Sequence, residues 1–299
     1  MDVMAWQKRL SDTFSTNGII GARVQMMLDA EAEHGEIYAT KFKGQMALGE
    51  SFKDFCLETF ELLNRVVAMH PEVVVTHHYL DLVGRHTMNF RSVGAAEMLC
   101  HYGYPMQGYS LLRNLFEQAV LMSAIMQGKT TMESVEGVSN GFVPATVKWD
   151  RIREEKRIFH LMYGAGSGLS EETIREISVW DDLFDLEVHG SRLSKIETKD
   201  WLEQKSALHF VPQFNQKALA MYMDRANEIG WMVLRVLPSL QPGPLSFGDE
   251  WANKWRVLDE SFKIAIDSLG KECGKKISAA IIEFVEEKFP FGPDYRFPI

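Results

Sequence analysis

The most continuous apolar pattern in the chain lies in residues 105–127, PMQGYSLLRNLFEQAVLMSAIMQ. A helix that is apolar around most of its circumference is normally buried. Pro105 at its start and Gly128 just past its end are typical of the two helix termini. Arg113 and Glu117 stand one helical turn apart in its middle and share one face. Because buried charges are costly unless paired, the sequence predicts a core helix that holds an ion pair.

Amphipathic segments with helical spacing surround this central stretch. Residues 72–84, EVVVTHHYLDLVG, have strand propensity, but no partner strand is found, so a helix that starts after Pro71 is predicted. The other predicted helices cover approximately residues 19–42, 50–69, 90–102, 145–162, 170–189, 214–240, 249–269 and 275–288. The fold class is therefore all-α, a multi-helix bundle of about ten helices around the buried helix 105–127.

Proline and glycine positions suggest how the bundle is divided. The segment 238–244, PSLQPGP, is the best candidate linker. We expect a helical extension over residues 1–49, a central helical bundle over 50–240, and a helical hairpin with a tail over 241–299. The GAGSG stretch at 164–168 follows a helix and lacks a Lys-Ser/Thr pair, so a helix connector is favoured over a phosphate-binding loop.

Composition narrows the classes of function. The hydrophobic fraction is 46% and the chain has seven Trp, which is enough for a substantial core. The formal net charge of −9 argues against a broad nucleic-acid-binding surface. The three cysteines, Cys56, Cys100 and Cys273, are far apart and form no CxxC, so buried free thiols are predicted.

Targeting and cofactor signals are not found in the sequence. No apolar run approaches 18 residues and the first residues do not resemble a secretory signal, so a cytoplasmic protein without membrane contact is expected. No cofactor or metal is predicted. Glu31 and His34 form one ExxH, but a di-iron bundle needs two, so a solvated acidic helix face is expected there.

The Arg113–Glu117 pair is the first candidate site. A guanidinium has five donors and stays charged, so a buried Arg needs more acceptors than one carboxylate supplies. The same helix face carries Tyr109 and Val120. Two interpretations stay open: a structural salt bridge that fixes helix register, or the floor of a polar pocket.

The second candidate stretch is FDLEVHGSRLS, residues 184–194. His189 is predicted at a helix end, where the helix dipole favours its charged form. Its neighbours Glu187, Ser191 and Arg192 complete a dense polar cluster. The alternative to a functional role for His189 is a helix C-terminal cap.

Together, GYSLLRNLFEQAVLMSAI and FDLEVHGSRLS resemble a family of uncharacterised bacterial helical proteins, over roughly residues 88–235. That family is distantly similar to HEPN helical bundles, whose members are often toxin or defence ribonucleases. The resemblance implies that Arg113, Glu117 and His189 gather at one catalytic site, with Tyr109, Ser191 and Arg192 as substrate-binding residues.

HEPN ribonucleases use an Arg followed by a His after four to six residues, usually at a dimer interface. Arg65 with His70 and Arg153 with His160 match this spacing, but neither pair is on the central helix. Three hypotheses follow: an enzyme acting on a phosphodiester or nucleotide; a non-catalytic anion-binding or regulatory module with a structural Arg113–Glu117 pair; and a homodimeric scaffold that uses the last 60 residues. A homodimer and an RNA or nucleotide ligand are the partners these hypotheses allow.

Overall fold

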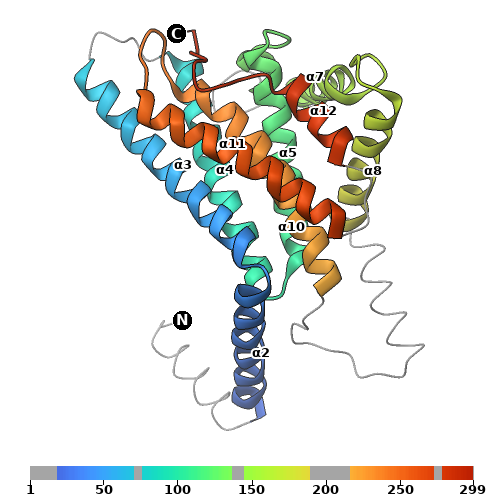
Figure 1. Ribbon diagram of the computed structural model, residues 1–299. Coiled ribbons are helices and arrows are strands. Elements are labelled where there is room, and N and C mark those ends of the chain that lie inside the picture. Colours follow the sequence, from blue (N-terminus) through green and yellow to red (C-terminus); the bar gives the residue numbers. More distant parts are fainter. Residues whose placement is uncertain (1–18, 71–75, 137–144, 189–215, 273–277, 299) are drawn as a thin grey trace, which may run out of the picture.

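The described part of the chain is built of helices joined by turns and followed by an irregular C-terminal tail. The computed structural model describes residues 19–70, 76–136, 145–188, 216–272 and 278–298. Within these ranges there is no β-strand, only one isolated bridge between Pro242 and Phe297. The prediction of an all-α bundle is confirmed (Figure 1).

The elements follow the predicted order closely. They are α2 (Ile19–Lys41), α3 (Lys43–Met69), α4 (His77–His101), α5 (Pro105–Met126), α6 (Met132–Glu136), α7 (Ala145–Tyr163), α8 (Glu171–Val188), α10 (Gln216–Val236), the 3₁₀ helix η1 (Leu237–Leu240), α11 (Asp249–Glu272) and α12 (Ser278–Lys288).

One prediction of separate helices is wrong. The segment after Pro71 and the helix expected at 90–102 are one continuous helix, α4. Thr76 begins it by accepting a hydrogen bond from the Tyr79 amide. The residues between the two predicted segments are part of the helix, and two of them, His86 and Asn89, are buried in the bundle. Their polarity is accommodated inside the bundle, so the helix continues through them.

Helix α5 is the centre of the bundle, as predicted. It packs against α4 and α10, and α7 and α8 also contact it (Figure 1). The six successive residues from Ala119 to Ala124 are all buried, so this part of α5 is surrounded on every side. The part of α5 before Ala119 is less enclosed, and it carries Arg113 and Glu117.

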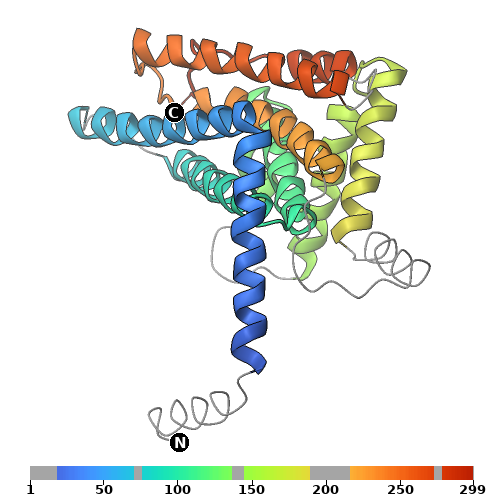
Figure 2. The ribbon, with the colours of Figure 1, turned by 60° about the horizontal axis from the view of Figure 1, so that its bottom comes forward.

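Helix α2 projects away from the rest of the bundle (Figure 2). Its C-terminal half is fixed by two contacts: His34 Nδ1 lies 2.9 Å from the His101 carbonyl oxygen, and Tyr104 donates to Glu31 Oε1 at 2.7 Å. The expectation that Glu31 and His34 form a solvated acidic face is therefore wrong. His34 is almost fully buried, because the turn between α4 and α5 covers it.

The segment predicted as a linker is packed inside the protein. The side chains of η1 and the following Gln241 are buried. Gln241 Nε2 donates to the Pro293 carbonyl oxygen at 2.7 Å, and Gln241 Oε1 accepts from the Phe247 amide at 3.0 Å. The prolines and glycine shape a compact turn that the C-terminal tail covers. The division at 49/50 and 240/241 stays a prediction.

The last 60 residues add to the core. Trp251 Nε1 donates to Thr59 Oγ1 at 2.8 Å and ties α11 to α3, while Trp255 Nε1 donates to the Leu234 carbonyl oxygen at 3.1 Å. Cys56 and Cys100 are buried free thiols, as predicted, and Cys273 lies outside the described residues.

Candidate functional site

The Arg113–Glu117 pair forms in the middle of α5. Arg113 Nε donates to Glu117 Oε1 at 2.8 Å, and the two side chains are 24% and 31% exposed. Tyr109, one turn earlier, is partly buried, and its ring meets Tyr222 of α10 edge-on, with the centroids 5.4 Å apart. The ion pair is therefore made as predicted, but it is partly accessible to solvent rather than enclosed.

A second polar group, which the sequence interpretation missed, lies on α10. Within the run DRANE, four polar residues are buried: Asp224, Arg225, Asn227 and Glu228. Arg225 Nη1 donates to Glu228 Oε2 at 2.6 Å, and these side chains are only 9% and 2% exposed. A signal was present in the sequence, because four polar residues among five interrupt an otherwise apolar helix face.

Two aromatic rings, Trp180 and Phe116, connect the Arg225–Glu228 pair to the helix that carries Arg113 and Glu117. The Arg225 guanidinium lies 4.1 Å from the centroid of the Trp180 ring on α8. Trp180 in turn meets Phe116 of α5 edge-on, with centroids 5.9 Å apart. Phe116 precedes Glu117 directly, so α5, α8 and α10 converge at the level of the accessible ion pair.

The two Arg–Glu pairs have different environments. The Arg225–Glu228 pair is desolvated and covered by Trp180, which is the arrangement of a structural buried pair. The Arg113–Glu117 pair keeps about a quarter of its surface in solvent, where a ligand can reach it. The position of Arg113 in the core helix and its partial exposure make it the better candidate for ligand contact.

Helix α8 runs antiparallel to α5. Its first turn lies beside α12, where Ser170 and Thr173 bind Glu283, and α12 ends at Lys288 beside Gln127 at the end of α5. Its middle residue Trp180 is level with Phe116, nearer the start of α5. The predicted site residues His189, Ser191 and Arg192 follow α8 in sequence and lie outside the described residues.

Known proteins supply no further evidence on function. No family model, no curated protein and no solved structure matches the chain. The interpretation of the site therefore rests on its geometry.

The two pairs with HEPN-like spacing are both at the surface. Arg65 is 68% exposed and lies 3.6 Å from Glu61 Oε2 on the same helix, and His70 comes after the end of α3. Arg153 and His160 are exposed on α7. Neither pair lies on α5 with the Arg113–Glu117 pair.

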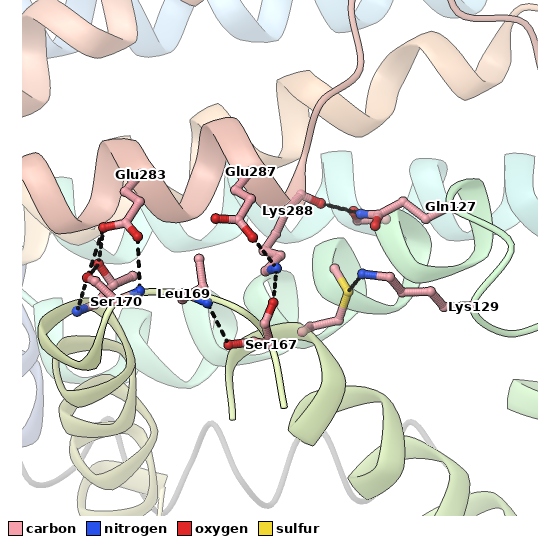
Figure 3. A network of polar contacts seen from close by, with 11 residues as sticks. Gln127, Lys129, Ser167, Leu169, Ser170, Glu283, Glu287 and Lys288 are labelled. Atoms are coloured by element: carbon pink, nitrogen blue, oxygen red, sulfur yellow. Dashed lines mark hydrogen bonds and ion pairs between the residues drawn. The ribbon is translucent and has the colours of Figure 1, made fainter. Parts of the chain in front are cut away.

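A network of hydrogen bonds and ion pairs at the N-terminal end of α8 holds that helix in place (Figure 3). Glu283 accepts hydrogen bonds from the Ser170 amide at 3.0 Å and from Thr173 Oγ1 at 2.7 Å. These hydrogen bonds, that of the Ser170 amide first, lower the pKa of the Glu283 carboxyl. A carboxylate at a helix N-terminus is also favoured by the helix dipole, so Glu283 acts as a cap supplied by α12.

Lys288 forms the other half of this network. Its buried ammonium donates to the Ser167 carbonyl oxygen and to Glu287 Oε1, and its own carbonyl oxygen accepts from Gln127 Nε2 at 2.7 Å (Figure 3). The GAGSG connector is thus fixed to α12 and α5. These contacts position α8 relative to α5, and hence position Trp180.

Metal and membrane sites are not indicated in the part of the chain that the structure describes. Its residues contain no group of three or more His, Cys, Asp or Glu side chains that could hold a metal ion. None of its helices is both long enough and apolar enough to cross a membrane.

Proposed function

We propose that the protein acts on a phosphodiester or nucleotide, in the manner of HEPN-like toxin or defence nucleases, at a site formed by Arg113, Glu117 and His189. The observation that carries this proposal is the Arg113–Glu117 contact of 2.8 Å, made on the core helix while both side chains stay partly exposed. A permanently charged, oriented guanidinium at the edge of a core is suited to binding a phosphate group.

Each residue has a distinct role in this proposal. Glu117 binds the Nε side of the Arg113 guanidinium and so fixes the plane of that group relative to α5. Arg113 stabilises the negative charge that develops on the phosphate oxygens during transfer. His189 moves the proton as general acid or base, because imidazole titrates near neutral pH. Tyr109, Ser191 and Arg192 contact the substrate.

The direction of α8 supports this grouping. From Trp180 to Val188 the helix advances about 12 Å, and from Phe116 back to Tyr109 α5 covers about 10 Å in the same direction. The end of α8 is therefore level with the stretch of α5 that carries Tyr109 and Arg113. His189 is the next residue after Val188 in the sequence.

A second candidate is a non-catalytic anion-binding or regulatory protein in which Arg113–Glu117 is structural. One observation favours it: the chain already contains a buried Arg–Glu pair within one helix, Arg225–Glu228, whose Arg225 packs on Trp180 of α8. Substituting the residues of the site separates the two candidates.

The test uses the purified full chain with single-stranded RNA, nucleoside triphosphates and cyclic dinucleotides as probes, and also measures growth of bacterial cells that express it. Arg113→Ala and His189→Ala are expected to remain folded. Arg113→Ala should weaken both binding and turnover, whereas His189→Ala should abolish turnover and keep binding.

The matched control is Arg65→Ala, which breaks the exposed Glu61–Arg65 pair of the same spacing on α3. It should leave binding and turnover unchanged. Binding lost in Arg113→Ala, with no turnover by the wild-type chain, would establish the anion-binding candidate. Absence of both binding and turnover in the wild-type chain would refute the phosphodiester proposal.

A further inference from the structure

A second site lies on another side of α5 and α10. A cavity of about 60 Å³ opens between α3, α4, α5, α10 and α11, close to the end of α2. Its walls are mainly apolar and include four aromatic rings, those of Tyr38, Phe52, Tyr222 and Phe262, after which we call it the aromatic cavity. The polar side chains of Gln45, Glu97 and Asn227 also line it. Neither Arg113 nor Glu117 lines it.

Two polar atoms of the aromatic cavity have no hydrogen-bond partner. They are Tyr222 Oη and Asn227 Nδ2. Tyr222 is 1% exposed and Asn227 is 5% exposed, so bulk solvent does not satisfy them. Buried polar atoms without partners are uncommon in folded proteins, and two at one cavity indicate that something else supplies their hydrogen bonds.

The charge of the cavity wall is balanced. Lys53 Nζ lies 2.7 Å from Glu97 Oε2, so the carboxylate is paired where α3 meets α4. Burial raises the pKa values of Tyr38, Tyr222 and the adjacent Cys100 thiol far above neutral pH, so these groups stay uncharged. The cavity therefore offers neutral polar groups and aromatic surface, and the one carboxylate in its wall is already ion-paired.

Glycines create the space on two sides. A Cβ atom at Gly49 of α3 would lie 3.0 Å from Glu97 Oε1, and one at Gly230 of α10 would lie 3.0 Å from Phe262 Cε1. Glycine inside a helix is less stable than alanine. At both positions a larger residue would crowd a side chain that lines the cavity, so glycine suits these positions.

We propose that the aromatic cavity binds a small neutral molecule with an apolar body and one carbonyl or hydroxyl oxygen, which accepts hydrogen bonds from Asn227 Nδ2 and Tyr222 Oη. On the scale where one water needs about 10–15 Å³, this volume holds a molecule of about five non-hydrogen atoms. The aromatic rings contact the apolar body. This inference is independent of the phosphodiester proposal, because it uses no residue of that site.

The binding test uses 2-butanone and 2-butanol as ligands, with 2-methylbutane as the apolar probe of similar size and butyrate and butylammonium as charged probes. Protein-observed NMR titration of the full chain measures each affinity. We expect the ketone and the alcohol to bind, each about tenfold more tightly than the hydrocarbon. We expect no binding of the charged probes.

Three variants locate the binding. Tyr222→Phe and Asn227→Leu each remove an unpartnered polar atom, so each should remain folded and weaken ketone binding about tenfold. Ala226→Leu fills the cavity and should abolish binding. If Ala226→Leu does not fold, the first two variants still decide the question.

Tyr79→Phe is the matched control, because the Tyr79 hydroxyl donates to the Leu240 carbonyl oxygen at 2.7 Å outside this cavity. It should reduce stability and leave ketone affinity unchanged. Equal ketone binding in the wild type, Tyr222→Phe and Asn227→Leu would overturn the proposal. Failure of the wild-type chain to bind any neutral probe, with only ordered water in the cavity of a crystal structure, would overturn it as well.

Discussion

Arg225 and Trp180 are stacked, with the guanidinium carbon 4.1 Å from the ring centroid, and this contact joins α10 to α8 inside the protein. The same guanidinium also forms the ion pair with Glu228. A cation held between an aromatic face and a carboxylate in a desolvated setting contributes more than a surface pair. The two Arg–Glu pairs should therefore respond very differently to substitution.

Arg225→Ala is expected to lower the free energy of unfolding by about 3–5 kcal/mol, because it removes the guanidinium from a nearly fully buried carboxylate. Arg113→Ala should lower it by no more than about 1 kcal/mol, since that pair is partly exposed. Urea unfolding followed by circular dichroism measures both. Equal losses for the two variants would show that the Arg113 pair is as structural as the Arg225 pair.

One buried hydroxyl links α11 to α3. Thr59 Oγ1 accepts from Trp251 Nε1 and donates to the Phe55 carbonyl oxygen, and Thr59 is fully buried. Thr59→Val leaves the indole N–H unsatisfied and should cost about 1–3 kcal/mol of stability.

Thr40→Val is the control for this variant. Thr40 makes the same hydrogen bond to its own helix, to the Glu36 carbonyl oxygen at 2.9 Å, on an exposed surface. Its effect should stay within about 0.5 kcal/mol. A thermal melt that shows equal shifts for both variants would contradict a role for Thr59 in holding α11.

His86 should make the protein sensitive to mild acid. Ser239 Oγ donates to the Val236 carbonyl oxygen, so it accepts from His86 Nε2 at 2.8 Å, and the unpartnered Nδ1 carries no proton. Burial lowers the pKa of His86 to about 3. The unfolded chain binds the proton more readily than the folded one. The contribution of neutral His86 to the free energy of unfolding is therefore complete above pH ~6.5, and it is lost as the pH decreases toward about 3.

The expected slope is about 1.4 kcal/mol per pH unit within that window. Unfolding free energies measured between pH 7 and pH 4 test it. His86→Gln should reduce the slope, whatever it does to stability at pH 7, and His78→Gln, at an exposed position, should not. An unchanged slope in His86→Gln would show that other groups control acid unfolding.

Glu283 should control the first turn of α8. Glu283→Gln removes the negative charge from the helix start and weakens the hydrogen bonds from Ser170 and Thr173. Amide hydrogen exchange in residues 170–174 is expected to become faster. Because the pKa of Glu283 is lowered, the wild-type protein should also lose this protection as the pH falls through the carboxyl range.

Glu286→Gln is the comparison for this effect. Glu286 is on the same helix and pairs with Lys263 at 2.9 Å, away from α8. It should not change exchange in residues 170–174. Faster exchange there in both variants would point to a general loosening of α12 instead of a cap.

Much of the secondary structure follows from helical periodicity, because the spacing of apolar residues shows where a helix lies and which face it buries. The central helix and its Arg113–Glu117 pair were predicted in this way. The continuity of α4 and the burial of residues 237–242 were not, since both depend on partners far away in sequence. The Nε2 atom of His86 is bonded to Ser239, and the Gln241 side chain to carbonyl groups of the C-terminal tail.

Prediction of the candidate sites from sequence is limited in the same way. A charge pair on an apolar helix is visible in sequence, but its degree of exposure depends on what packs beside it. The buried DRANE row was detectable as a polar interruption of α10. The aromatic cavity was not, because Tyr222 and Asn227 are ordinary residues until the packing leaves their polar atoms without partners.

The bond from Tyr79 to the Leu240 carbonyl oxygen has a consequence for synthesis of the protein. The two residues are 161 positions apart, so at ribosomal speed Tyr79 emerges roughly ten to thirty seconds before its acceptor exists. Phe297, whose ring centroid lies 6.2 Å from that of Tyr79, is synthesised later still. During translation the Tyr79 side chain therefore stays without both of these contacts until the C-terminal segments have been synthesised.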